Sequence, residues 1–131
     1  KLEMKLLNSS DSPAAFSYAT DVFESNENRV QENSRFANDM VLSAAYGANG
    51  SDHVWYSFQF FDAASSSIHT KYIGQGGGYN NNALKAANMI SSGIQYATAA
   101  VTSKVRFVLA GSTSFDTDDG CYYRLYGHTY S

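Results

Sequence analysis

Histidine side chains could do acid–base chemistry near neutral pH, and the chain has three of them. Two imidazoles, or an imidazole and a glutamate, could cleave RNA if they converged on one sheet face beside an arginine. The residues available for such a set are His69, His128, Arg106, Arg124 and Glu27. No diagnostic spacing ties any of them to another, so a small secreted ribonuclease stays an alternative hypothesis and no catalytic residue is predicted.

Two clusters could hold a phosphate or a cation. The glycine run at 74–78 stands where a phosphate loop would, but Tyr79 breaks the G-x-G-x-x-G pattern. We therefore expect a flexible connector there, with anion binding at the start of a following helix as the alternative. The second cluster is an acidic run that comprises Asp116, Asp118 and Asp119 with Gly120. It lacks the ligands at alternate positions and the closing glutamate of a calcium loop, so we expect a solvated turn rather than a loose cation site.

Aromatic residues near the C-terminus form the best candidate binding surface. If 121–126 is a strand, alternate side chains point outward and could stack on sugars or bases, although an ordinary half-buried strand is the simpler interpretation. The predicted binding residues are Tyr122, Arg124, Tyr126, His128 and Trp55. Zinc-ligand spacings are absent from the chain, so we predict neither a metal nor a cofactor.

Composition limits the classes of partner. The chain has 131 residues, which fits one domain over 1–131, and only 16% of them are charged. Its net charge of −3 argues against binding to duplex nucleic acid, which requires a basic surface. A neutral surface rich in aromatic and hydroxyl groups suits a glycan or another protein better. No apolar run approaches the roughly 20 residues of a membrane span, so a soluble protein is expected.

Several features favour a secreted protein. The first residue is Lys1 and not Met, so we expect either a processed chain or an expressed fragment. Two N-glycosylation triplets begin at Asn8 and Asn49. Cys121 is the single cysteine, so an internal disulfide framework is excluded. We interpret Cys121 as a buried thiol, with an intermolecular bridge as the alternative.

Apolar spacing predicts both helices and strands. Residues recurring at helical intervals predict helices near 13–24, 28–46 and 83–101, the first of them beginning at Pro13 after a Ser12 cap. Alternating residues predict strands near 2–6, 54–62, 67–73, 104–110 and 121–126. This order predicts an α+β fold, namely a split β-α-β, ferredoxin-like α/β sandwich with its helices packed on one face of an antiparallel sheet. The other face of that sheet would stay free to bind a partner.

This architecture resembles that of the virally encoded killer toxins of smut fungi and the salt-mediated yeast killer toxin. The resemblance covers nearly the whole chain. It depends on the strand around Met4, the helix ending near Tyr46, the 54–73 hairpin, the helix at 82–101 and the strands at 104–126. It implies a secreted antifungal toxin that acts without catalysis by binding the wall or membrane of a sensitive cell. Its partners would be a cell-surface glycan or membrane protein, or a sibling subunit from the same precursor. A carbohydrate- or protein-binding effector module without toxicity is the alternative.

Overall fold

The described part of the chain consists of β-strands joined by turns and loops. The computed structural model describes residues 2–43, 53–80, 85–96, 99–109, 124, 126 and 127. Over those residues it contains no helix, and hence none that is long and apolar enough to cross a membrane. The predicted α+β, ferredoxin-like sandwich is therefore wrong, and the described fold is all-β.

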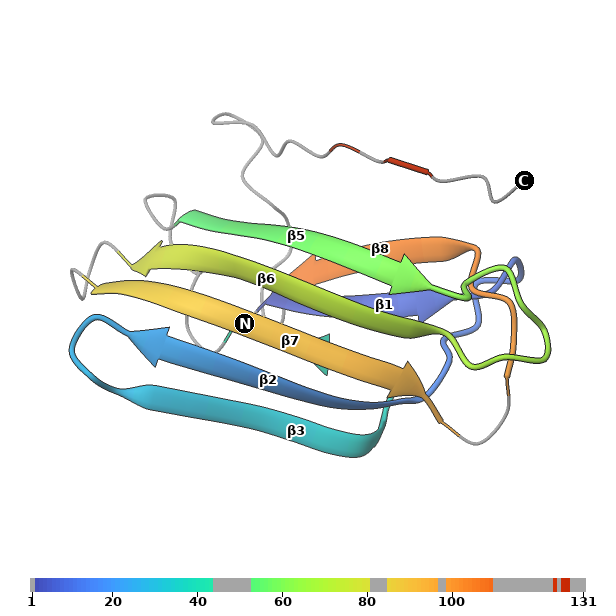
Figure 1. Ribbon diagram of the computed structural model, residues 1–131, viewed down its shortest axis with the longest axis horizontal. Coiled ribbons are helices and arrows are strands. Elements are labelled where there is room, and N and C mark those ends of the chain that lie inside the picture. The colour runs from blue at the N-terminus through green and yellow to red at the C-terminus, as the bar shows by residue number, and fades with distance from the viewer. Residues whose placement is uncertain are drawn as a thin grey trace.

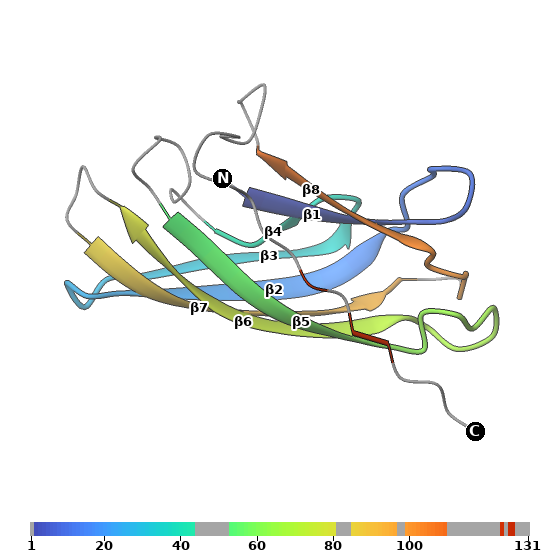
Figure 2. The ribbon, with the colours of Figure 1, turned by 90° about the horizontal axis from the view of Figure 1, so that it is seen from above.

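The strands form two antiparallel sheets that face each other (Figures 1 and 2). The smaller sheet has the order β4-β1-β8, with β1 at Leu2–Leu7, β4 at Met40–Val41 and β8 at Lys104–Leu109. The larger sheet has the order β3-β2-β7-β6-β5. Its strands are β2 (Phe16–Glu24), β3 (Arg29–Ala37), β5 (His53–Phe61), β6 (Lys71–Asn80) and β7 (Lys85–Gln95). A second sheet, rather than a pair of helices, covers one face of the larger sheet.

The three predicted helices are all replaced by strands. The stretches 13–24, 28–46 and 83–101 contain β2, β3 with β4, and β7. A spacing of four residues, such as that between Ile90 and Ile94, fits a helix, but it also fits a strand because four is an even number. Pro13 does not begin a helix and instead forms an isolated bridge with Leu7. Apolar spacing alone could not separate the two structures here.

Turns and connectors account for two further differences. The polar stretch at 25–28, where the first two predicted helices meet, is the hairpin turn between β2 and β3, with Glu27 at a φ of 65°. The glycine run at 74–78, predicted to be a connector, lies inside β6 and pairs with both β5 and β7. The predicted strands at 2–6, 54–62 and 104–110 are confirmed, whereas that at 67–73 overlaps only the beginning of β6. In the stretch 121–126, only Arg124 and Tyr126 are described, and neither is in a strand.

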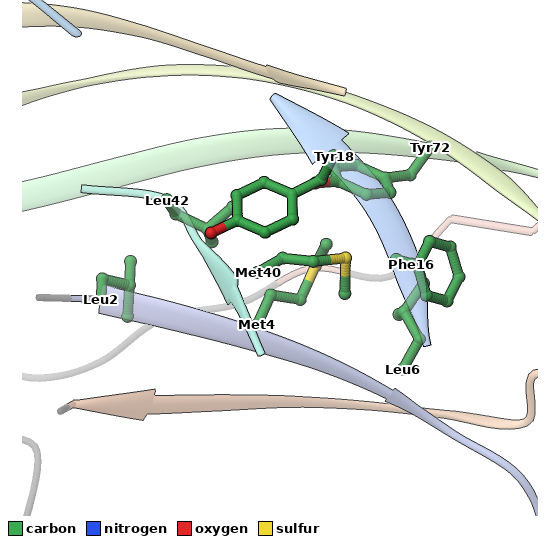
Figure 3. Packing of buried hydrophobic residues seen from close by; sticks show 8 residues of the cluster. All are labelled: Leu2, Met4, Leu6, Phe16, Tyr18, Met40, Leu42 and Tyr72. Carbon is green, nitrogen blue, oxygen red and sulfur yellow. The ribbon is translucent and has the colours of Figure 1, made fainter. Parts of the chain in front are cut away.

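The main core lies between the two sheets (Figure 3). The smaller sheet and the residues after β4 supply Leu2, Met4, Leu6, Met40 and Leu42, and the larger sheet supplies Phe16, Tyr18 and Tyr72. Aromatic residues of β5 add contacts to this core. The Phe58 ring of β5 packs against the Phe107 ring of β8, with their centres 5.6 Å apart, and this contact joins the two sheets. Burial of this apolar surface is the main force that holds the sheets together.

A chain of hydroxyl groups also crosses the core. The Thr20 hydroxyl donates to the Val41 carbonyl oxygen at 2.6 Å and lies 2.8 Å from the Ser91 hydroxyl. The Ser91 oxygen is in turn 3.0 Å from the Tyr72 hydroxyl. These bonds link β6, β7 and β2 of the larger sheet to β4 of the smaller one, and they satisfy polar atoms that burial would otherwise leave unpaired.

The buried tyrosines predict a loss of stability in alkali. Burial raises the pKa of Tyr72 to about 12, and burial also raises the pKa of Tyr56 above its ordinary value near 10. The unfolded chain therefore loses these protons first, so the free energy of unfolding is highest below pH 10 and falls as the pH rises toward 12. Each such tyrosine contributes a slope of about 1.4 kcal/mol per pH unit in that range. Urea unfolding at pH 9–11.5 should show a smaller slope for Tyr72→Phe than for the wild type, and equal slopes would contradict the assignment.

Candidate functional site

The larger sheet has one face that points away from the smaller sheet, and we call it the outer face. This face carries large exposed apolar side chains. Alternate residues of β2, β7, β6 and β5 point to it, because successive side chains of a strand lie on opposite faces. The exposed apolar residues of this face are Phe23, Trp55, Phe61, Ile73, Ile90 and Ile94, which are 38–61% exposed. Isolated exposed apolar residues are ordinary, but several on one face of a sheet favour a site of interaction.

A hollow of about 630 Å³, here called the cross-strand depression, lies at one end of the outer face. Pairing aligns Trp55 of β5 with Gly77 of β6, Asn88 of β7 and Phe23 of β2 in one row across the sheet. The next row brings Ser57, Gln75 and Ile90 alongside. The outward side chains that line the hollow are Phe23, Trp55, Ser57, Gln75, Asn88 and Ile90.

Two glycines shape the depression. Gly77 has no side chain, so the Trp55 indole of the neighbouring strand lies over it, and a β-carbon added to Gly77 would be only 2.8 Å from Trp55 Cε2. Gly76 belongs to the floor of the hollow, where an added β-carbon would overlap the Trp55 carbonyl oxygen. The absence of a side chain at Gly77 therefore makes room for the indole, which keeps 61% of the Trp55 surface exposed, and its absence at Gly76 lets the backbone of β5 approach closely.

The charges beside the depression neutralise each other. The Arg29 guanidinium donates two hydrogen bonds to the Asp21 carboxylate, at 2.9 and 2.6 Å, and lies 4.9 Å from the centre of the Phe23 ring. The hydrogen bond from Arg29 is the main reason why the pKa of Asp21 is lower than usual. Among the residues that the structure describes, none that lines the hollow is charged. The site therefore suits an uncharged ligand with hydroxyl groups and apolar faces.

The structure describes only some of the predicted binding residues, and it places one of them in the depression. Trp55 lies in the depression, on the exposed side of β5. Arg124 and Tyr126 are exposed, and Tyr126 has 77% of its surface accessible. Tyr122 and His128 lie outside the described residues, as do Cys121 and the acidic run at 116–120. The predicted surface at 121–126 therefore stays a prediction, and Trp55 is the member of the set that the structure places in a hollow.

The described members of the hypothetical ribonuclease set do not converge. His69 Nδ1 is 2.8 Å from the carbonyl oxygen of Gln95, which pairs with Phe16 at the start of β2. Glu27 lies in the turn beyond the other end of β2, about 27 Å away at 3.3 Å per residue. Arg106 is on the smaller sheet, paired with Lys5. Within the described ranges, the His, Cys, Asp and Glu side chains also form no group of three that could hold a metal ion.

Most of the depression does not follow from the sequence pattern. Phe23, Asn88 and Ile90 fall within predicted helices, and Gln75 falls within a predicted connector. The signal that connects them is the pairing of each strand with its neighbours, which brings residues from 23, 55, 75 and 88 into adjacent rows. Such a pairing depends on contacts between distant parts of the chain, so the local spacing of apolar residues does not predict it.

No protein-family model, curated protein or solved structure matches the chain. The resemblance to fungal killer toxins therefore stays a prediction, although the described parts of the two helices that helped to carry it are strands. What the chain can bind is inferred below from the geometry of the site.

Proposed function

We propose that this chain is a non-catalytic binding protein that recognises a neutral carbohydrate in the cross-strand depression. The observation that carries the proposal is the exposed Trp55 indole lying over Gly77, at the side of a hollow that has no charged lining. The ring faces of aromatic residues carry partial negative charge, which attracts the partially positive C–H groups on one face of a sugar ring.

The polar residues of the depression support a carbohydrate as the ligand. The side-chain amides of Gln75 and Asn88 can each donate and accept hydrogen bonds, and the Ser57 hydroxyl can do both as well. Sugar hydroxyls have the same dual capacity, so the two sets of groups can satisfy each other. An anionic polymer would find no cation in the lining, and the net charge of −3 would repel it.

This proposal includes the mode of action that the sequence predicted. A secreted protein that binds neutral glycans could attach to the wall of a fungal cell, and a toxin acting by contact would begin with that step. Whether attachment inhibits growth is decided by applying the protein and its binding-deficient variant to fungal cultures. Cleavage of RNA that disappears in His69→Ala or His128→Ala would instead support the ribonuclease alternative.

Another protein is the second candidate ligand, and the far end of the outer face favours it. Ile73, Ile94 and Phe61 remain 38–50% exposed there, outside the depression. Phe36 and Tyr96 are also exposed, and their rings meet edge to face at 4.3 Å. Aliphatic side chains surrounded by polar residues are typical of protein interfaces rather than of sugar sites.

The variant Trp55→Ala is expected to weaken binding to neutral glycans about tenfold, which corresponds to the loss of about 1.4 kcal/mol of stacking energy. Binding is measured on an array of glucan, mannan and chitin oligosaccharides, with an acidic polysaccharide for comparison. Phe61→Ala is the matched control, because Phe61 is an exposed aromatic residue on the same strand and the same face but outside the depression.

The control also separates the two candidate ligands. Loss of binding in Trp55→Ala, with Phe61→Ala unchanged, supports the carbohydrate site. Failure of the wild type to bind any neutral glycan contradicts it. Attachment to cells that persists after enzymatic removal of wall glycans, and that weakens in Phe61→Ala, would favour the protein ligand instead.

A further inference from the structure

The positions of two aromatic residues indicate the length and the direction of the ligand as well as its chemical class. Trp55 and Phe23 lie in the same row of the larger sheet, on β5 and β2, with β6 and β7 between them. Three strand spacings of about 4.8 Å separate the two backbones by about 14 Å, and the Trp55 indole covers the first of these spacings because it lies over Gly77 of β6. About 10 Å therefore remains between the indole and the backbone of Phe23. A six-membered sugar ring is about as wide as a phenylalanine ring, so a single sugar cannot contact both platforms.

The groups between the platforms follow the same line across the strands. Asn88 lies in the row that joins Trp55 to Phe23, and Gln75 lies in the next row. Ile90, which is 50% exposed, stands in that second row as well and adds an apolar contact to the lining. A ligand running from Trp55 to Phe23 would therefore have hydrogen-bonding side chains along its middle and an aromatic ring near each end.

Both ends of this line remain accessible. Trp55 is 61% exposed on β5, the last described strand of the larger sheet on that side, and Phe23 is 42% exposed on β2. Beyond Phe23 the row ends at Arg29, which lies at the surface on β3, the last strand on the other side. A site for a chain end would be closed around one terminal sugar, whereas this one is a shallow trough with two separate platforms.

From these positions we infer that the depression binds an internal stretch of a linear, neutral polysaccharide lying across the strands, with Trp55 and Phe23 as two stacking platforms. The inference rests on the proposed function and adds the length and direction of its ligand. Acidic sugars are disfavoured because Arg29 is already paired with Asp21, whose carboxylate lies in the same row as Gln75 and Ile90.

The test is a series of oligosaccharides of increasing length, taken from whichever neutral glycan the wild-type protein binds on the array. The affinity is expected to rise from the disaccharide until both platforms are occupied and then to stay constant. Phe23→Ala should weaken binding of the long oligosaccharides about tenfold, because one of two aromatic contacts is lost. It should weaken binding of the disaccharide no more than about twofold, since the disaccharide can still occupy Trp55.

Oligosaccharides capped at both ends provide a second measurement. Unchanged affinity after capping supports recognition of an internal stretch, whereas a tenfold loss would overturn it. Equal affinity for the disaccharide and the longest oligosaccharide would overturn the inference while leaving the proposed function standing. Absence of binding to every neutral glycan would overturn both. Phe61→Ala again serves as the control and should follow the wild type at every length.

Discussion

Gly76→Ala is expected to destabilise the protein by about 3 kcal/mol or more, an effect at the upper end of those caused by overfilling a packed site. Gly76 pairs with Tyr56 of β5 and with Met89 of β7, so strands enclose it on both sides. A β-carbon at this position would overlap the carbonyl oxygen of Trp55, and its next neighbour would be the Trp55 carbonyl carbon at 3.0 Å. Backbone atoms held in a ladder cannot move aside as a flexible side chain can.

Two other glycines provide a graded comparison for this prediction. Gly127→Ala should change the free energy of unfolding by less than about 0.5 kcal/mol, because no atom of the described residues lies within 4 Å of an added β-carbon there. Gly74→Ala should fall between the two, since its added atom would meet the Phe58 ring at 2.5 Å and a ring can rotate away. Urea unfolding followed by circular dichroism measures all three variants. If Gly76→Ala lowers the free energy of unfolding no more than Gly74→Ala does, the backbone of β5 can move to make room for the added β-carbon, and the prediction is wrong.

The pairing of glycine with an aromatic residue recurs in the larger sheet. Phe58 stands opposite Gly74, and Tyr72 stands opposite Gly93, each with its ring over the glycine. On the outer face the same arrangement places the Trp55 ring over Gly77. The glycines thus make room for rings from the adjacent strand, which explains how a glycine-rich stretch can be a central strand despite the low strand propensity of glycine.

The strands that could be predicted from sequence are those in which local alternation is clear. In β1 the inward residues Leu2, Met4 and Leu6 alternate with charged residues, and this pattern alone identifies a half-buried strand. In β6 the glycine run contains no side chains that could show a period. Its structure is determined by contacts with Phe58 and Trp55 of the next strand, and these depend on the folded arrangement.

In the second half of β7, from Ile90 to Gln95, the usual relation between burial and hydrophobicity is reversed, which explains the wrong prediction there. The inward positions include Ser91 and Gln95, whose side chains make hydrogen bonds in or near the core. The outward positions include Ile90 and Ile94, which are 50% and 44% exposed. A pattern analysis that assigns the most apolar stripe to the core therefore selects the wrong side of this segment.

One residue of the candidate site could be predicted from the sequence, and the residues that surround it could not. Trp55 could be identified because the alternation in 54–61 is clear enough to define two faces of one strand. Phe23, Gln75 and Asn88 could not be joined to it, because their proximity requires the order β2-β7-β6-β5. That order places β7 between β2 and β6, so segments about 60 residues apart in sequence pair with each other, and no local motif specifies such a pairing.

A comparison of Phe16 with Phe23 tests the corrected fold most directly. The two residues are seven positions apart, a separation that places them on the same side of a helix but on opposite faces of a strand. Phe16 is fully buried in β2, with its ring centre 6.2 Å from that of Tyr72, whereas Phe23 is 42% exposed on the outer face. A helix would require both side chains in the core, and the strand requires one.

Phe16→Ala is therefore expected to lower the free energy of unfolding by about 3–5 kcal/mol, because it leaves a cavity between the two sheets. Phe23→Ala should cost only about 1 kcal/mol, since much of its ring is already in contact with water. Urea unfolding monitored by circular dichroism measures both variants, and Phe16→Leu supplies a milder change if Phe16→Ala does not fold. Equal losses in Phe16→Ala and Phe23→Ala would contradict the strand and restore the helical interpretation of this segment.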